Sequence, residues 1–245
     1  MPTTDKIQIS AKDIGAMALE GFCPRCFWIK RKAKKLPWQI FPGIFSSIDA
    51  YVKRVVHKHI DLFGVSPEWL TAGPGREIIG YLPATHWSKF KMVDPGTGII
   101  VSGATDDILV CDDDLGDIIV DYKTAKHTEN ADKLLPMYIA QLNGYADIYE
   151  SMGGKVSALQ IIYCEPMTDI AEYNPPMGPL GYALEFQAKT LPVFRDGTLV
   201  PALLRLASPI LAGAIPAAGI GCKDCEALDS IIKTAIIENI AIVPS

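Results

Sequence analysis

Two stretches decide the fold of this chain: VSGATDDIL at residues 101–109 and IIVDYKT at residues 118–124. Their apolar runs predict two strands, and the acidic loop CDDDLG at residues 111–116 predicts a hairpin between them. With the centre of the hairpin in the middle of that loop, Asp106 lies directly opposite Asp121. A slip of one residue would bring Asp107 to that place instead.

This pair of carboxylates predicts a metal site. Two carboxylates with Cβ atoms roughly 5 Å apart repel each other unless a cation lies between them, and Mg²⁺ or Mn²⁺ suits oxygen ligands. Lys123 lies two residues after Asp121 and points from the same face of the strand, where it could position a water that the ion makes more acidic. The alternative is that these aspartates are ordinary strand-end and turn carboxylates and that Lys123 is a solvated charge.

Outward from the hairpin, the sequence predicts an α/β fold. Apolar residues at spacings of three and four predict a helix over residues 44–60, which Gly64 ends. The other expected elements are strands over residues 77–82, 87–93, 99–110, 117–123, 157–163 and 182–186, and helices over residues 131–152 and 202–212. This order suits a mixed β-sheet flanked by helices.

Four of the six cysteines form two Cys-x-x-Cys pairs, Cys23/Cys26 and Cys222/Cys225, one near each end of the chain. Two such pairs suit a four-thiolate centre that holds either zinc or a [4Fe–4S] cluster. If the pairs meet, the centre clips the N- and C-terminal segments together. A thiol–disulfide motif or unligated core thiols are the other interpretations. The two remaining cysteines are interpreted as core or edge thiols: Cys111 and Cys164.

The composition bounds the class of protein. The 245 residues carry 23 Lys and Arg against 28 Asp and Glu, a net charge of −5, and 49% of the chain is hydrophobic. These values exclude a disordered chain and a histone-like polycation. The basic stretch Lys30–Lys35 fits equally a solvated helix face and a phosphate-contacting surface, with Trp28 and Trp38 available for base stacking.

Neither end of the chain predicts a membrane or secretory segment. Residues 1–14 lack the apolar run of a secretory signal. Residues 199–220 contain Arg205 and three prolines, which disfavours a membrane-spanning helix. We therefore expect a soluble, cytoplasmic protein with reduced cysteines.

Three motifs in order resemble the PD-(D/E)XK nuclease superfamily, and within it the RecB-like branch. They are Gly-x-x-Asp at Gly103–Asp106, Asp-x-Lys-Thr at Asp121–Thr124 and Gln-x-x-x-Tyr at Gln141–Tyr145. The resemblance covers roughly residues 43–165 and implies a restriction-endonuclease-like fold. It also implies roles for five residues, with Asp106 and Asp121 as ligands of Mg²⁺ or Mn²⁺, Lys123 assisting the nucleophilic water, and Gln141 and Tyr145 orienting the substrate or the lysine.

The cysteine pairs carry a narrower resemblance, to the CRISPR-adaptation type of RecB-like exonuclease. FCPRCFW at residues 22–28 is similar to the Tyr-Cys-Pro-Arg-x-x-Trp opening of those proteins, and GCKDC at residues 221–225 is similar to their C-terminal clamp. The resemblance implies a [4Fe–4S] cluster. This chain departs from the pattern, because it has two cysteines at each end in place of one and three, so zinc stays an alternative. It also has Ser47 where the family has a helix-borne His, with Asp49 as a possible stand-in.

The function implied by these resemblances is a metal-dependent deoxyribonuclease, an exonuclease that prefers single-stranded DNA, with a structural iron–sulfur cluster. Residues 1–245 would form one nuclease domain, with a core at 43–198 and cysteine-bearing terminal segments at 1–42 and 199–245. DNA is the expected partner, in repair, phage replication or CRISPR adaptation. The competing hypotheses are a non-catalytic nucleic-acid-binding subunit with a degenerate site and a zinc-stabilised interaction module.

Overall fold

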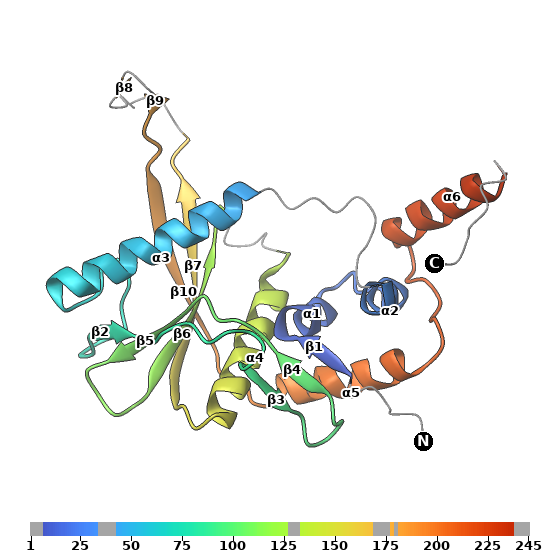
Figure 1. The fold of residues 1–245 in the computed structure, drawn as a ribbon, viewed down its shortest axis with the longest axis horizontal. Coiled ribbons are helices and arrows are strands. Elements are labelled where there is room, and N and C mark those ends of the chain that lie inside the picture. The colour runs from blue at the N-terminus through green and yellow to red at the C-terminus, as the bar shows by residue number, and fades with distance from the viewer. Residues whose placement is uncertain (1–6, 34–42, 127–132, 169–176, 179–180, 238–245) are drawn as a thin grey trace.

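The structure is a computed structural model that describes residues 7–33, 43–126, 133–168, 177–178 and 181–237 (Figure 1). In chain order the elements are β1 (Gln8–Ser10), α1 (Ala11–Gly15), a 3₁₀ turn (Ala16–Ala18), α2 (Pro24–Ala33), α3 (Gly43–Phe63), β2 (Ile78–Tyr81), β3 (Lys91–Val93), β4 (Ile100–Ser102), β5 (Asp107–Cys111), β6 (Asp117–Lys123), α4 (Leu135–Ser151), β7 (Val156–Pro166), β8 (Met177–Gly178), β9 (Gly181–Tyr182), β10 (Phe186–Val193), α5 (Leu199–Ala212) and α6 (Lys223–Ile237). Helices and strands come in runs along the chain, with β2–β6 and β7–β10 on either side of a single helix.

A five-stranded sheet forms the centre of the fold. Its strand order is β10-β7-β6-β5-β2, and its neighbours are antiparallel except for the parallel pair β6 and β7. A smaller sheet has the order β1-β4-β3 and is also mixed. Helix α3 covers one face of the large sheet and α4 the other (Figure 1). The expected mixed sheet flanked by helices is therefore confirmed.

Alternation along the strands builds a separate core on each face. On β6, Ile119 packs with α4, whereas its neighbours Ile118 and Val120 pack with α3. Successive side chains of a strand point to opposite faces, so one apolar run serves both layers. This is why the run Ile118–Val120 is continuously hydrophobic.

The hairpin of β5 and β6 has the predicted register. Asp107 pairs with Val120 and Ile108 pairs with Ile119. Asp106, the residue before β5, is therefore placed opposite Asp121. This register decides which of the two adjacent aspartates faces α4.

The predicted strand over residues 99–110 is wrong in one respect, because it is two strands in different sheets. The chain leaves the small sheet after β4, and the N–H of Gly103 donates to the carbonyl of Phe90 at 3.1 Å. It then crosses to the large sheet and enters β5 at Asp107. Gly103 permits the crossing, since a Cβ there would lie 2.4 Å from Cε1 of Tyr145.

The predicted strand over residues 182–186 is also wrong. β9 ends at Tyr182 and residues 183–185 belong to no strand, while an eight-residue strand, β10, runs from Phe186 to Val193 beside β7. Pro192 lies within β10, and a proline disfavours a central strand. β10 lies at the edge of the sheet, where a missing N–H donor is tolerated.

The helix predicted over residues 44–60 is confirmed as α3, but only part of its apolar stripe is buried. Val52, Val56 and Ile60 pack on the sheet, whereas Tyr51 and Val55 are exposed. α4 begins at Leu135, with proline in its first turn, and α5 confirms the third expected helix. No helix among the described residues is long and apolar enough to cross a membrane.

The described part of the N-terminal segment contacts both the small sheet and helix α4. β1 pairs with β4 in parallel, and α1 packs directly on α4, where a Cβ on Gly144 would lie 2.8 Å from Cβ of Ala11. In contrast, α6 extends away from the sheets at the far end of the molecule, next to α2 (Figure 1).

Candidate active site and metal centre

The two predicted carboxylates lie at the end of the hairpin. Asp121 is on β6 and is 2% exposed. Asp106 lies in the bend before β5, where its Oδ2 accepts the N–H of Tyr122 at 2.9 Å. Burial first, and the charge of Asp121 second, raise the pKa of Asp106 to about 7, although Lys123 opposes the shift. The pair therefore resists holding two negative charges without a cation.

Lys123 is bound to this pair through Asp121. Its ammonium forms an ion pair with Oδ2 of Asp121. Nζ of Lys123 also lies 4.6 Å from the ring centroid of Tyr138 on α4. The lysine is thus held beside the carboxylates on the α4 face, as the strand period predicts.

Gln141 and Tyr145 reach the same place from α4. Nε2 of Gln141 donates to Oδ1 of Asp121 at 3.1 Å and to the hydroxyl of Tyr145 at 2.8 Å. Both residues are buried, and they lie one helical turn apart, on the same face. The ring of Tyr145 packs against Gly103. All five residues predicted for the catalytic site are therefore brought together.

The donor set of this cluster fits a hard divalent cation. The carboxylates offer oxygen ligands, and Oε1 of Gln141 is a buried acceptor without a partner among the described residues. A cation with coordinated water would relieve the repulsion between Asp106 and Asp121 and give that amide oxygen a donor. Asp106 and Asp121 are the residues that would hold the ion.

Ser47, at the position where the sequence resemblance led us to expect a helix-borne His, does not reach the carboxylates. Ser47 is exposed, and its hydroxyl donates to the carbonyl of Gly43 within α3 at 3.2 Å. Asp49 reaches the rim of the site, because its Oδ1 accepts the hydroxyl of Thr124 at 2.9 Å. No hydrogen bond or ion pair among the described residues joins Ser47 to the carboxylate pair.

A second polar cluster, which the sequence reasoning missed, lies on the α3 face. Buried Asp107 accepts from Nε2 of His57 at 2.9 and 3.0 Å and from the hydroxyl of Tyr122 at 3.2 Å. Lys53 lies 4.0 Å from the same carboxylate and donates to the carbonyl of Asp106. The signal was the spacing of Asp49, Lys53 and His57, which repeat every four residues along one side of α3.

The two cysteine pairs meet. Cys26 Sγ lies 3.4 Å from Cys225 Sγ and 3.5 Å from Cys222 Sγ, and Cys23 Sγ lies 3.6 Å from Cys225 Sγ. All four sulfur atoms lie within 4.8 Å of one another. The expected joining of the terminal segments is confirmed, and the four thiols can hold a metal.

Local contacts favour a thiolate in this centre. Burial acts to raise the pKa of Cys23, but the N–H groups of Cys26 and Gly219, together with hydrogen bonds from the Cys222 and Cys225 thiols, lower that pKa to about 6. Beside the centre, the guanidinium of Arg25 on α2 binds the carboxylate of Asp229 on α6 with two hydrogen bonds, at 2.6 and 2.9 Å. This ion pair joins the same two helices as the cysteines.

The basic stretch is partly engaged within the protein. Lys30 and Arg31 pair with Asp13 at 2.7 and 3.2 Å. Lys32 lies over the ring of Trp28 at 5.7 Å from its centroid, and the indole of Trp28 donates to the carbonyl of Gly213 at 3.1 Å. Lys34, Lys35 and Trp38 lie outside the described residues. These contacts favour the helix-face interpretation for the described cations.

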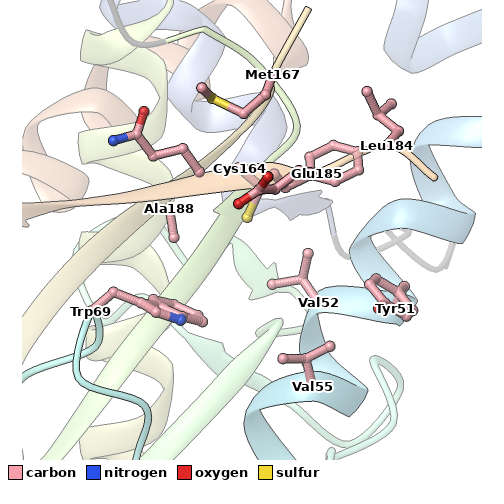
Figure 2. Close-up of a pocket in the computed structure, with 11 residues that line it drawn as sticks. Tyr51, Val52, Val55, Trp69, Cys164, Met167, Leu184, Glu185 and Ala188 are labelled. Carbon is pink, nitrogen blue, oxygen red and sulfur yellow. The ribbon is translucent and has the colours of Figure 1, made fainter. Parts of the chain in front are cut away.

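An apolar cavity of about 710 Å³ lies on the α3 side of the sheet. Figure 2 shows Val52 and Val55 extending from α3 toward Trp69 and Cys164. None of the five residues of the carboxylate site lines this cavity. Cys164 is buried in the core on this side of the sheet and is not one of the four clustered cysteines, as expected for a core thiol.

Comparisons with known proteins give a short match. No family model matches the chain. A segment of 65 residues is 46% identical to an ATP-dependent helicase/nuclease subunit from Ligilactobacillus salivarius (strain UCC118), and it makes up 26% of this chain and 5% of that protein's length. The crystal structure of SSO0001 superposes with a TM-score of 0.44 at 12% identity over 88% of this chain and 81% of that one, a similarity too low to carry an argument.

Proposed function

We propose that this protein is a metal-dependent nuclease of the PD-(D/E)XK type that hydrolyses phosphodiester bonds in DNA. The observation that carries the proposal is the convergence of Asp106, Asp121 and Lys123 at one end of the hairpin, with Gln141 and Tyr145 bound to them from α4. The 65-residue similarity to a helicase/nuclease subunit supports a RecB-like nuclease.

In this proposal Asp106 and Asp121 hold Mg²⁺ or Mn²⁺, which supplies a more acidic water and positive charge for a phosphate oxygen. Lys123, which forms an ion pair with Asp121, would orient an attacking water toward the phosphorus. Its ammonium also offsets the negative charge that develops on the phosphate oxygens. Gln141 keeps the carboxylate of Asp121 turned toward the ion, and Tyr145 fixes the amide of Gln141.

Contact with DNA would extend onto α3. Arg54 and Lys58 are exposed on this helix and lie one turn apart, so their charges can follow a phosphate backbone. We infer that a single strand is the preferred substrate and that cleavage is exonucleolytic. The cysteine centre is structural in this scheme, an iron–sulfur cluster or a zinc ion that joins α2 to α6 within one nuclease domain.

One observation favours the competing function of a non-catalytic DNA-binding subunit. Ser47 replaces a metal-binding histidine and is turned into its own helix. A site with two carboxylate ligands binds its ion less tightly than one with a further side-chain ligand. DNA binding would then persist while cleavage was lost.

Labelled DNA separates these functions. Single strands and duplexes carrying a label at either end are incubated with the protein and Mn²⁺, with and without a chelator. A nuclease shortens the strands only with metal, and the labelled end that disappears first gives the polarity. If the DNA is shifted in a native gel but stays intact with every divalent metal, the protein is a DNA-binding subunit and not a nuclease.

A further inference from the structure

The spacing of the four cysteine sulfurs discriminates between the two kinds of centre. Three contacts join Cys26 with Cys225, Cys26 with Cys222 and Cys23 with Cys225, at 3.4, 3.5 and 3.6 Å. Disulfide bonds are far shorter, at about 2.05 Å. Around one tetrahedral ion with metal–sulfur bonds of about 2.3 Å, the sulfurs lie about 3.8 Å apart.

A [4Fe–4S] cluster needs a wider frame. Its four thiolates bind four different irons at the corners of a cube, so their sulfurs lie roughly 6 Å apart. All four sulfurs of this chain lie within 4.8 Å of one another, so the arrangement fits one ion and is too narrow for the cube.

We propose that Cys23, Cys26, Cys222 and Cys225 bind one zinc ion in a tetrahedral four-thiolate site, in place of the [4Fe–4S] cluster that the sequence resemblance implies. The inference concerns this centre alone. It does not depend on whether the carboxylate site cleaves DNA.

The two halves of the site have the same local geometry. Cys23 directly precedes α2 and Cys222 directly precedes α6, and the second cysteine of each pair lies in the first helical turn. Four thiolates around a divalent ion carry net negative charge, which the positive ends of both helix dipoles stabilise. The N–H groups of Gly219 and Cys26 donate to Cys23 Sγ at 3.2 and 3.5 Å and stabilise the same charge.

A neighbouring cavity does not provide the space for a cluster. It has a volume of about 240 Å³ and is lined by Cys23, Cys26 and Cys222 among other residues, but not by Cys225. The four sulfurs therefore do not surround it. A cluster placed there would lack its fourth ligand.

The metal content of the full chain tests the proposal. The protein is expressed with both iron and zinc supplied, purified without oxygen, and analysed for metals and acid-labile sulfide. We expect about one zinc per chain, no sulfide and no colour. After exchange with Co²⁺, we expect the intense red-region absorption of a tetrahedral thiolate site. Brown protein with about four irons and an equal amount of sulfide per chain would overturn the proposal, as would protein that binds no metal.

Variants localise the ion. Cys225→Ser should retain less than about a tenth of the wild-type zinc, whereas Cys111→Ser and Cys164→Ser, which alter the two cysteines outside the centre, should retain all of it. Full zinc in Cys225→Ser would contradict the assignment. In reconstitution of unfolded, metal-free wild type, zinc should restore the native circular dichroism, and iron with sulfide should not. The opposite result would support the cluster. These experiments measure only metal content and folding. Their failure can therefore be distinguished from failure of the nuclease assay.

Discussion

The fold places the carboxyl group of Asp106 where a negative charge is unfavourable. Burial and the neighbouring Asp121 raise its pKa to about 7, and Lys123 compensates only in part. Sites that bind cations commonly have this character, because the ion removes the repulsion when it arrives. At the residue scale, the carboxylate pair therefore lowers the stability of the fold unless a cation binds there.

The raised pKa predicts a pH dependence of stability in the metal-free protein. Between the ordinary value of 3.8 and about 7, the folded chain keeps a proton on Asp106 that the unfolded chain has lost. The free energy of unfolding should therefore fall as the pH rises through this window. Asp106→Asn should flatten that part of the curve and be more stable than wild type at about pH 8. Urea melts in chelator measure this. Parallel curves for both proteins would show that the carboxyl is not perturbed.

Lys123→Ala should abolish cleavage and leave DNA affinity nearly unchanged. The lysine acts on charge that develops during the reaction, and removal of one such group costs about 10²-fold or more in rate. DNA binding depends on the wider cationic surface. Lys89→Ala, which removes the same charge at an exposed position, is the control. Asp121→Ala should differ from Lys123→Ala, because added Mn²⁺ should partly restore it. A Lys123→Ala protein that cuts at the wild-type rate would exclude this role.

At the scale of elements, sequence patterns predict those that have a strong period or a clear end. β6 begins and ends as expected, and α3 ends at Phe63, directly before Gly64. The break between β4 and β5 was not predicted, because residues 99–110 were interpreted as one strand. The packing of Tyr145 on Gly103 shows where the chain crosses between the sheets. β10 was not predicted, because Pro192 argues against a strand at this place and is tolerated only at the edge of a sheet.

Among the site residues, the three motifs and both cysteine pairs were found from the sequence. The cluster of Lys53, His57 and Asp107 was not, since it depends on which face of the sheet α3 covers. That information lies in tertiary packing. In the sequence, this cluster was indicated by the four-residue spacing along α3.

Gly103→Ala tests the crossing between β4 and β5. The added Cβ would lie 2.4 Å from the ring of Tyr145, so the ring must move and its hydrogen bond with Gln141 must change. We expect a loss of about 1–3 kcal/mol in the free energy of unfolding, with slower cleavage. Gly21→Ala, whose Cβ would meet nothing within 4 Å, should behave as wild type. Equal stability of the two variants would show that Gly103 is not required.

At the scale of the whole molecule, the cysteine centre joins parts that have few other contacts. Cys225 is the one buried residue among the described side chains of α6, and Arg25 with Asp229 forms an exposed ion pair beside it. Exposed ion pairs contribute little to stability. The attachment of α6 therefore depends on the cysteine centre.

Cys225→Ser should lower Tm more than Cys111→Ser or Cys164→Ser does. Loss of one thiolate of four weakens a centre whose binding energy is coupled to folding, and we expect a fall of about 5 °C or more. Cys111 and Cys164 are buried but lie outside the centre, so they control for replacing a buried thiol. Equal melting temperatures for the three variants would argue against a shared metal.

The most direct test of the proposed nuclease site compares two adjacent carboxylates. Asp106 lies beside Asp121 in the carboxylate site, whereas Asp107 lies on the α3 side of the sheet and binds His57. The measurement is the rate of Mn²⁺-dependent cleavage of end-labelled single-stranded DNA by wild type, Asp106→Asn and Asp107→Asn. We predict a loss of about 10²-fold or more for Asp106→Asn and a rate within about threefold of wild type for Asp107→Asn. Cleavage that survives in Asp106→Asn, or that is lost equally in both variants, would contradict the proposed site.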